Sequence, residues 1–333
     1  MTTPFILPFN GVTPRIGLLT GCADRVAVLG RTVIGARALL GAGVTIRADG
    51  EDVTIGDDFA FGARGLVHIS GGQYETHIGH RVAAGRNAVI HACTVGDDCV
   101  IGDDCIILDG AVLGDGVVLM PGSVVFPRSV LEADTVYAGS PARPEGPADA
   151  ALREGLRQVI VTAATTDRIP DPMGSVPGIF TARTARIDGR VEAATNASVF
   201  FGCDLTARGG VIRIGPRTNV QDNSILRADA QDLVIGADTT IGHNVQMTDC
   251  TIADGVLVGM GARLAPGTKV ETDVLVAAGT VTEPGQVLTS GKLWGGNPAR
   301  PIADMTEARR AVFTSTITHY CDYAAAFRAA QGD

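Results

Sequence analysis

The sequence predicts an all-β solenoid made of two parallel β-helix domains of the hexapeptide-repeat type, each followed by an α-helix. Three observations predict this fold class. Apolar residues recur every six positions, the same five-residue irregularity interrupts this period once in each half, and a similar proline-containing segment ends each half. A period of six fits neither an amphipathic α-helix nor a simple half-buried strand.

The six-residue period is clearest in the middle of each half. In the first half Ile90 follows Ala84 by six positions and Ile101 follows Val95 by six, but Val95 follows Ile90 by only five. The second half keeps the same order and the same shortened step in Ile235, Ile241, Met247, Ile252, Val258 and Leu264. Because the irregularity is shared as well as the period, we interpret the two halves as an internal duplication.

A hexapeptide repeat of this kind forms a short strand and a corner, and three such units close one triangular coil. Stacked coils then bury the repeated apolar residue in a continuous interior column. The composition suits this architecture, because 43 glycines supply permissive backbone at the corners and only 5% of the residues are aromatic.

Each half ends in a nearly repeated segment, residues 136–144 and 293–301, and a charged, Ala-rich stretch follows each one. We expect these stretches to be α-helices over about 147–162 and about 304–331. A Pro- and Gly-containing passage after the first helix indicates a linker. The predicted domains are residues 1–168, a β-helix with its trailing helix, and residues 169–333, a β-helix with its C-terminal helix.

The composition argues against a nucleic-acid partner and a membrane span. The formal net charge is -9, whereas phosphate binding needs clustered Lys and Arg. No apolar run approaches the roughly 18 residues that a membrane span needs, and the first residues lack the pattern of a signal peptide. Cys93, Cys99 and Cys105 stand six apart, which predicts small buried thiols in a reducing compartment. We therefore expect a cytoplasmic protein.

Histidines are the candidates for metal chemistry. A catalytic zinc site needs three neutral imidazoles and an open position for water. Neither half alone supplies three histidines in matching positions. We expect His77 and His80 to be polar residues of the repeat, and His319 to be a solvated or packed residue of the last helix. The six histidines of the chain are His68, His77, His80, His91, His243 and His319.

In the first half Arg47 and Asp49 form an Arg-x-Asp element, His68 follows Val67, and His91 lies in the block of residues 84–93 at the start of the shortened step. With these residues the half resembles a γ-class carbonic anhydrase, a family of trimeric left-handed β-helix enzymes. The family carries Arg-x-Asp, then Asn-x-Gln-Asp and a His, then a Gly-His-x-x-x-x-His-Gly-Cys block. By this resemblance His68 is the first metal ligand and His91 the third, while Arg86 stands where the second belongs.

The second half resembles the same family through other residues. Gln221 and Asp222 match the Gln-Asp pair, which the first half replaces by Gly62 and Ala63, and His243 matches the second ligand. In the family the second ligand comes from a neighbouring subunit across an interface. The remaining positions of the second half depart from the family pattern, with Arg227 for the first histidine, Thr248 for the third, and Thr206 and Arg208 for the Arg-x-Asp element.

The resemblance therefore implies that each half retains complementary parts of one metal site. We expect His68, His91 and His243 to bind one Zn²⁺ at an interface between a first and a second domain. Iron(II) or cobalt(II) would also suit three imidazole ligands. The reverse interface would bring together two arginines and a threonine, and it should bind no cation because cationic side chains repel a divalent metal.

Zinc with three imidazole ligands lowers the pKa of its water to about 7, and the resemblance implies reversible hydration of CO₂ to bicarbonate. It implies that Gln221 orients the hydroxide or CO₂. Arg47 and Asp49 would organise the interface around bicarbonate, and Asp222 would support Arg47 or a ligand. A salt bridge without a chemical role is the other interpretation of Arg47, Asp49 and Asp222.

Two other functions stay open at this point. Hexapeptide acyltransferases share the solenoid and often use one His as a base, and some relatives of this family serve as non-catalytic assembly subunits. Glu51 and Glu75 are the nearby acidic candidates for a proton shuttle. As partners we expect CO₂ or bicarbonate and further copies of this chain, joined through interfaces between first and second domains in a closed assembly.

Overall fold

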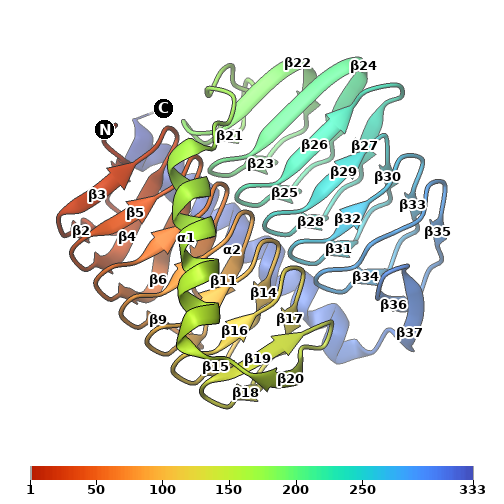
Figure 1. Ribbon diagram of the computed structural model, residues 1–333. Helices are drawn as coiled ribbons and strands as arrows, with labels where there is room; N and C mark the ends of the chain where they lie inside the picture. Colours follow the sequence, from red (N-terminus) through yellow and green to blue (C-terminus); the bar gives the residue numbers. More distant parts are fainter. Residues whose placement is uncertain (1, 333) are drawn as a thin grey trace. The chain divides into compact units, whose positions relative to one another are not determined.

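The computed structural model describes residues 2–332, and they form a parallel β-solenoid with two helices (Figure 1). The expected all-β solenoid is thereby confirmed. The chain divides into two compact units, the first ending at Asp171 and the second beginning at Pro172. No helix in the described part of the chain is long and apolar enough to cross a membrane.

The first unit is a stack of coils with three faces. One sheet bends around two faces through the long strands β4 (Ala27–Ile34) and β6 (Thr45–Ile55), while a second sheet forms the third face. The first face contains β8 (Leu66–His68), β11 (Val89–His91), β14 (Ile106–Ile107) and β17 (Val124–Val125). The second contains β9 (Thr76–Ile78), β12 (Thr94–Val95), β15 (Val112–Leu113) and β18 (Val130–Leu131). The third contains β3 (Leu19–Cys22), β5 (Ala38–Leu40), β7 (Ala60–Phe61), β10 (Ala83–Ala84), β13 (Val100–Ile101), β16 (Val118–Leu119) and β19 (Thr135–Ala138).

The second unit repeats this plan. Here β22 (Arg186–Ala193) and β24 (Asp204–Ile214) are the long strands that join two faces. The first face contains β26 (Ile225–Ala228), β29 (Gln246–Thr248) and β32 (Arg263–Leu264). The second contains β27 (Leu233–Ile235), β30 (Thr251–Ile252), β33 (Lys269–Val270) and β35 (Val287–Leu288). The third contains β21 (Phe180–Thr181), β23 (Ser198–Val199), β25 (Asn219–Val220), β28 (Thr240–Ile241), β31 (Leu257–Val258), β34 (Leu275–Val276) and β36 (Lys292–Gly295).

The six-residue period forms the interior of each stack, as predicted. In the first unit Ala84, Ile90 and Ile101 are fully buried in one cluster with Cys99 and Cys105. The expected burial of these thiols is confirmed, and it raises the pKa of both to about 12 because a thiolate is poorly solvated there. Strands of adjacent coils pair in register, so these apolar side chains stack into one interior column.

The shortened step is a tight corner between the first and second faces. It follows His91 in the first unit and Thr248 in the second, and each corner is turned by a residue with positive φ, Ala92 at 51° and Asp249 at 50°. Because the two shortened corners occupy the same place in their coils, they give a fixed point from which equivalent positions of the two units can be counted.

Each helix begins after the chain has returned as an antiparallel strand, β20 (Arg143–Pro147) or β37 (Arg300–Asp304). For this reason α1 (Ala150–Thr166) and α2 (Glu307–Gln331) begin slightly later than expected, and α1 extends beyond 162. The Asp149 side chain caps α1 by accepting the Leu152 N–H at 2.8 Å. Helix α1 contacts β5, β7, β10 and β13 on the third face of its unit (Figure 1), and α2 contacts β21, β23, β25 and β28 on the third face of its own.

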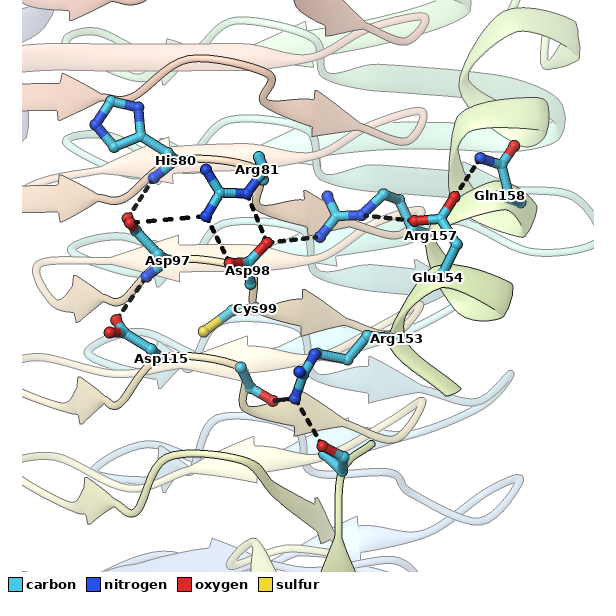
Figure 2. A network of polar contacts seen from close by, with 12 residues as sticks. His80, Arg81, Asp97, Asp98, Cys99, Asp115, Arg153, Glu154, Arg157 and Gln158 are labelled. Atoms are coloured by element: carbon cyan, nitrogen blue, oxygen red, sulfur yellow. Dashed lines mark hydrogen bonds and ion pairs between the residues drawn. The ribbon is translucent and has the colours of Figure 1, made fainter. Parts of the chain in front are cut away.

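Charged corners fasten α1 to the coils, as Figure 2 shows. Arg81 binds Asp98 of the next coil through two hydrogen bonds of 2.7 and 2.6 Å, and Arg157 of α1 reaches the same carboxylate at 4.0 Å. These hydrogen bonds from Arg81 lower the pKa of Asp98 although burial opposes the shift. Arg153 of α1 binds Asp134 at 2.6 Å.

Candidate metal centre

Strand register identifies equivalent positions on the first faces of the two units. In the first unit His68 at the end of β8 pairs with His91 at the end of β11. In the second unit Arg227 on β26 pairs with Thr248 on β29, directly before the equivalent shortened corner. The first unit therefore presents two adjacent imidazoles, 5.3 Å apart between ring centroids, where the second presents an arginine and a threonine.

The third faces show the opposite distribution. Arg86 lies two residues beyond the end of β10, and Ala63 two residues beyond its neighbour β7. In the second unit the positions two residues beyond β28 and its neighbour β25 hold His243 and Asp222. In the second unit an imidazole thus follows a carboxylate at the same position of the preceding coil, whereas in the first unit an arginine follows an alanine.

His68 is held by Arg47 at both ring nitrogens. Nδ1 lies 2.8 Å from the Arg47 carbonyl oxygen, and Nε2 lies 2.7 Å from Arg47 Nη2. Since a carbonyl oxygen only accepts and a guanidinium only donates, the ring is the neutral Nδ1–H tautomer with its Nε2 lone pair facing the guanidinium. The Arg47 charge is balanced by Asp49, whose Oδ2 lies 3.0 Å from Nη1, and both side chains are fully buried.

His91 is oriented by a carboxylate from the next coil. Its Nδ1 lies 2.7 Å from Asp109 Oδ1. Burial raises the pKa of the Asp109 carboxyl, but hydrogen bonds from His91 and the Ser70 hydroxyl outweigh it, and the pKa lies below its ordinary value. The carboxylate therefore accepts the Nδ1 proton of His91, and Nε2 keeps its lone pair.

His243 is oriented in the same sense within the second unit. Its Nδ1 lies 3.1 Å from Asp222 Oδ2, while Asp222 Oδ1 accepts the Phe201 N–H at 3.0 Å. On the other side of the ring, Nε2 forms a 3.2 Å hydrogen bond with the hydroxyl of Tyr320 on α2. The direction of this second hydrogen bond follows the tautomer of His243.

Gln221 is buried beside this histidine's strand and is fixed by a neighbouring amide. Its Nε2 donates to Asn219 Oδ1 at 3.1 Å, and Asn219 Nδ2 donates to Thr240 Oγ1 at 3.0 Å. The chain of amides gives Gln221 one orientation, with the carboxamide oxygen directed away from Asn219. Both first-unit imidazoles therefore have the tautomer that a metal ligand needs, and the second unit adds a third imidazole beside a carboxylate, which fits the donor set of a zinc ion.

The other histidines have structural surroundings. The His80 N–H donates to Asp97 Oδ1 at 2.7 Å and its Nδ1 accepts the Asp57 N–H at 3.0 Å, so His80 takes part in a ladder of corner hydrogen bonds. His77 is an exposed residue of β9. His319 is an exposed residue of α2 near Tyr323.

Two residues at these imidazoles escaped the sequence prediction, Asp109 and Tyr320. Asp109 lies 18 positions from His91, one coil further along, and that spacing would have identified it. Tyr320 lies 77 positions from His243 on a helix outside the repeat, and no periodicity connects them. Of the acidic candidates for a shuttle, Glu51 accepts the Gly72 N–H at 3.1 Å and Glu75 is exposed.

Comparison with known proteins points to two groups. A family model described as bacterial transferase hexapeptide (six repeats) matches residues 92–127. Gamma carbonic anhydrase 1, mitochondrial, of Arabidopsis thaliana is 34% identical over 157 residues, and the match covers 45% of this chain and 57% of the plant protein. The carbonic anhydrase of Geobacillus kaustophilus (strain HTA426) is 30% identical over 129 residues, covering 38% of this chain and 71% of that protein.

A solved structure shares the fold over nearly the whole chain. It is a proposed acetyltransferase from Desulfovibrio desulfuricans G20, with a TM-score of 0.56 and 15% identity, and the match covers 97% of this chain and 82% of that one. At this identity the likeness concerns the fold alone. The chain spans little more than half the length of its plant relative, 57%.

Proposed function

Because the chain belongs to the γ-carbonic anhydrase-like family of hexapeptide-repeat proteins, we propose that it binds one zinc ion and catalyses the reversible hydration of CO₂ to bicarbonate. The ligands are His68 and His91 of a first unit and His243 of a second unit, from the same chain or from neighbouring chains. The observation that carries the proposal is that each of these buried imidazoles has its Nδ1 within 3.1 Å of an oxygen atom of its own unit.

Zinc with three imidazole ligands and an open position lowers the pKa of water to about 7, and so supplies the nucleophile for CO₂ at neutral pH. Gln221, with its amide fixed by Asn219, orients that water or CO₂ through its carboxamide. The buried Arg47–Asp49 pair lies beside His68, and its guanidinium is the candidate donor to the oxygen atoms of bicarbonate. Asp222 contacts His243, so we assign it the support of a ligand rather than of Arg47.

Tyr320 and Arg47 compete with the metal for imidazole lone pairs. The Tyr320 hydroxyl is hydrogen-bonded to His243 Nε2, and Arg47 donates to His68 Nε2, so both groups must move aside when the imidazoles ligate a cation. Once released, the two groups are donors beside the proposed centre, where they can hold the oxygen atoms of bicarbonate.

The deciding experiment is metal analysis of the purified protein combined with a CO₂ hydration assay. We expect about one tightly bound zinc per chain, with hydration activity that a chelator removes and added zinc restores. Iron(II) or cobalt(II) in place of zinc would change the metal but leave the ligand assignment intact. A protein without bound metal and without hydration activity would contradict the proposal.

A hexapeptide acyltransferase is the second candidate, favoured by the match of residues 92–127 to the bacterial transferase repeat. Binding of acyl-CoA in a calorimeter, in protein without metal, would support it over CO₂ hydration. If neither ligand nor metal binds, a non-catalytic assembly role is the function that remains. For the hydratase we further propose a closed homo-oligomer with first-unit/second-unit interfaces and a cytoplasmic location.

A further inference from the structure

Asp109 lies in the corner that follows β14, one coil beyond His91, and its carboxylate bridges two successive coils. The distance from Asp109 Oδ1 to His91 Nδ1 is 2.7 Å, and the imidazole is 6% exposed. A neutral imidazole carries its proton on either nitrogen. In water, or beside a weaker acceptor, the two tautomers of His91 would interconvert, and only the form protonated on Nδ1 leaves Nε2 free to bind a metal.

The backbone around Asp109 is fixed by the coil itself. The Asp109 carbonyl oxygen accepts the Arg128 N–H at 2.9 Å, and the Gly110 N–H donates to the Ala92 carbonyl at 2.7 Å across the shortened corner. The Ser70 hydroxyl also contributes to lowering the pKa of the Asp109 carboxyl. The corner that carries this carboxylate is therefore held by the backbone of the neighbouring coils.

The second unit provides an internal comparison. The Gly267 N–H donates to the Asp249 carbonyl, which corresponds to the Gly110–Ala92 bond of the first unit. The Gly285 N–H donates to the Pro266 carbonyl, as the Arg128 N–H does to that of Asp109. Pro266 therefore occupies the place of Asp109 in the unit where Thr248 occupies the place of His91. The carboxylate is present only where the imidazole is present, which a role in the solenoid alone would not require.

We propose that Asp109 is a positioning residue that holds His91 in its metal-binding tautomer and orientation, and thereby sets the affinity of the zinc site. The effect on zinc affinity rests on the proposed function, whereas the effect on the His91 tautomer does not. Carboxylate acceptors behind metal-binding histidines raise ligand basicity and fix ring orientation, and their loss typically costs about 10–100-fold in metal affinity.

Two measurements on the full chain test this role. In metal-free protein with ¹⁵N-labelled histidine, the ¹H–¹⁵N correlations of the ring should show His91 as the Nδ1–H tautomer, and Asp109→Ala should convert it to a mixture. In competition with a chelator, Asp109→Ala should bind zinc about 10–100-fold more weakly than the wild type. Asp109→Asn keeps an acceptor oxygen and should lose less than about tenfold.

Asp104→Ala is the matched control, because Asp104 accepts a corner hydrogen bond from Asn87 at 2.8 Å, as Asp109 accepts one from His91. It should leave both the His91 tautomer and the zinc affinity unchanged. If Asp109→Ala does not fold, Ser70→Ala loosens the same carboxylate without removing it and should shift both readouts in the same direction by a smaller amount.

The outcomes separate the two proposals. Wild-type protein that binds zinc while Asp109→Ala keeps both the affinity and the tautomer would overturn the role of Asp109 and leave the proposed function standing. Wild-type protein that binds no zinc would overturn the proposed function, and the tautomer measurement would still decide whether Asp109 positions His91.

Discussion

The two units share a fold and differ in which parts of one site they retain. The first unit combines two imidazoles with the Arg47–Asp49 pair and Asp109. The second unit combines one imidazole with Asp222 and Gln221. At equivalent positions the second unit has Thr206, Arg208, Arg227, Thr248 and Pro266, and the first unit has Gly62, Ala63 and Arg86.

This difference teaches that ligands and supporting residues are kept or lost together. Ala63 lies below Arg86, whereas Asp222 lies below His243, so the carboxylate is absent where its histidine is absent. Arg86 instead binds Asp167 at the end of α1 at 2.5 Å.

The largest expected difference between the two units is in zinc binding, when the equivalent third-face residues His243 and Arg86 are each replaced by alanine. His243→Ala should abolish zinc binding and CO₂ hydration, because two imidazoles cannot complete the ligand set. Arg86→Ala removes ion pairs with Asp167 and Asp103 but no ligand, and should retain the zinc. Zinc content by mass spectrometry and stopped-flow hydration check both. Equal zinc in the two variants would refute the ligand assignment.

Shortening a core side chain at equivalent positions of the two first faces should have a smaller effect than losing a ligand. It should lower the free energy of unfolding by a similar amount in both units. Ile107 and Leu264 are at most 3% exposed in the interior columns of their units. Ile107→Ala and Leu264→Ala should each lower the free energy of unfolding by about 2–5 kcal/mol. Urea unfolding followed by circular dichroism measures this, and Trp294 fluorescence reports on the second unit. A cost below about 1 kcal/mol would argue against a close-packed column.

Removing the carboxylate from the third face of the second unit should weaken zinc binding, whereas adding one to the third face of the first unit should not create a zinc site. Asp222→Ala should weaken zinc binding about 10–100-fold, since His243 loses the acceptor 3.1 Å from Nδ1. Ala63→Asp places a carboxylate at the equivalent position of the first unit, where Arg86 stands instead of a ligand, and should add no metal. Chelator competition determines the affinities and metal analysis the stoichiometry. A second zinc in Ala63→Asp would show that the first unit's third face is still competent.

The smallest expected effect concerns the charged corners, where the two units behave alike. Hydrogen bonds from Arg81 lower the pKa of Asp98, and those from Arg310 of α2 lower the pKa of Asp273. The ordinary pKa of such a carboxyl is 3.8. When folding lowers this pKa, the carboxylate stabilises the fold at every pH above 3.8, and the contribution is lost as the pH falls through the folded-state pKa.

Arg81→Ala and Arg310→Ala should therefore each lower the melting temperature only slightly at neutral pH, because solvent screens these exposed ion pairs. The difference in melting temperature from the wild type should shrink below about pH 4. Melting curves between about pH 3 and 7 measure it. A difference that grows on acidification would show that the ion pairs are not its cause.

Much of the fold could be read from the period alone. The apolar residues at six-residue spacing became the interior columns, and the shared shortened step became the corner after His91 and Thr248. The helix boundaries were less accurate, because a strand such as β20 carries no periodic signal and its antiparallel pairing with β19 depends on the end of the stack. Sequence identified His68 and His91 as candidates, and register placed them side by side.

The sequence by itself determined the solenoid, its duplication and the complementary sets of candidate ligands, because these depend on local spacing that survives without coordinates. Only the tertiary structure decided which atoms meet. It placed His68 against the carbonyl of Arg47, His91 against the carboxylate of Asp109 and His243 beside the carboxylate of Asp222, and it brought Tyr320 to His243. Hydrogen bonds join residues of different coils and of a distant helix, and their geometry follows from packing that no spacing along the chain encodes.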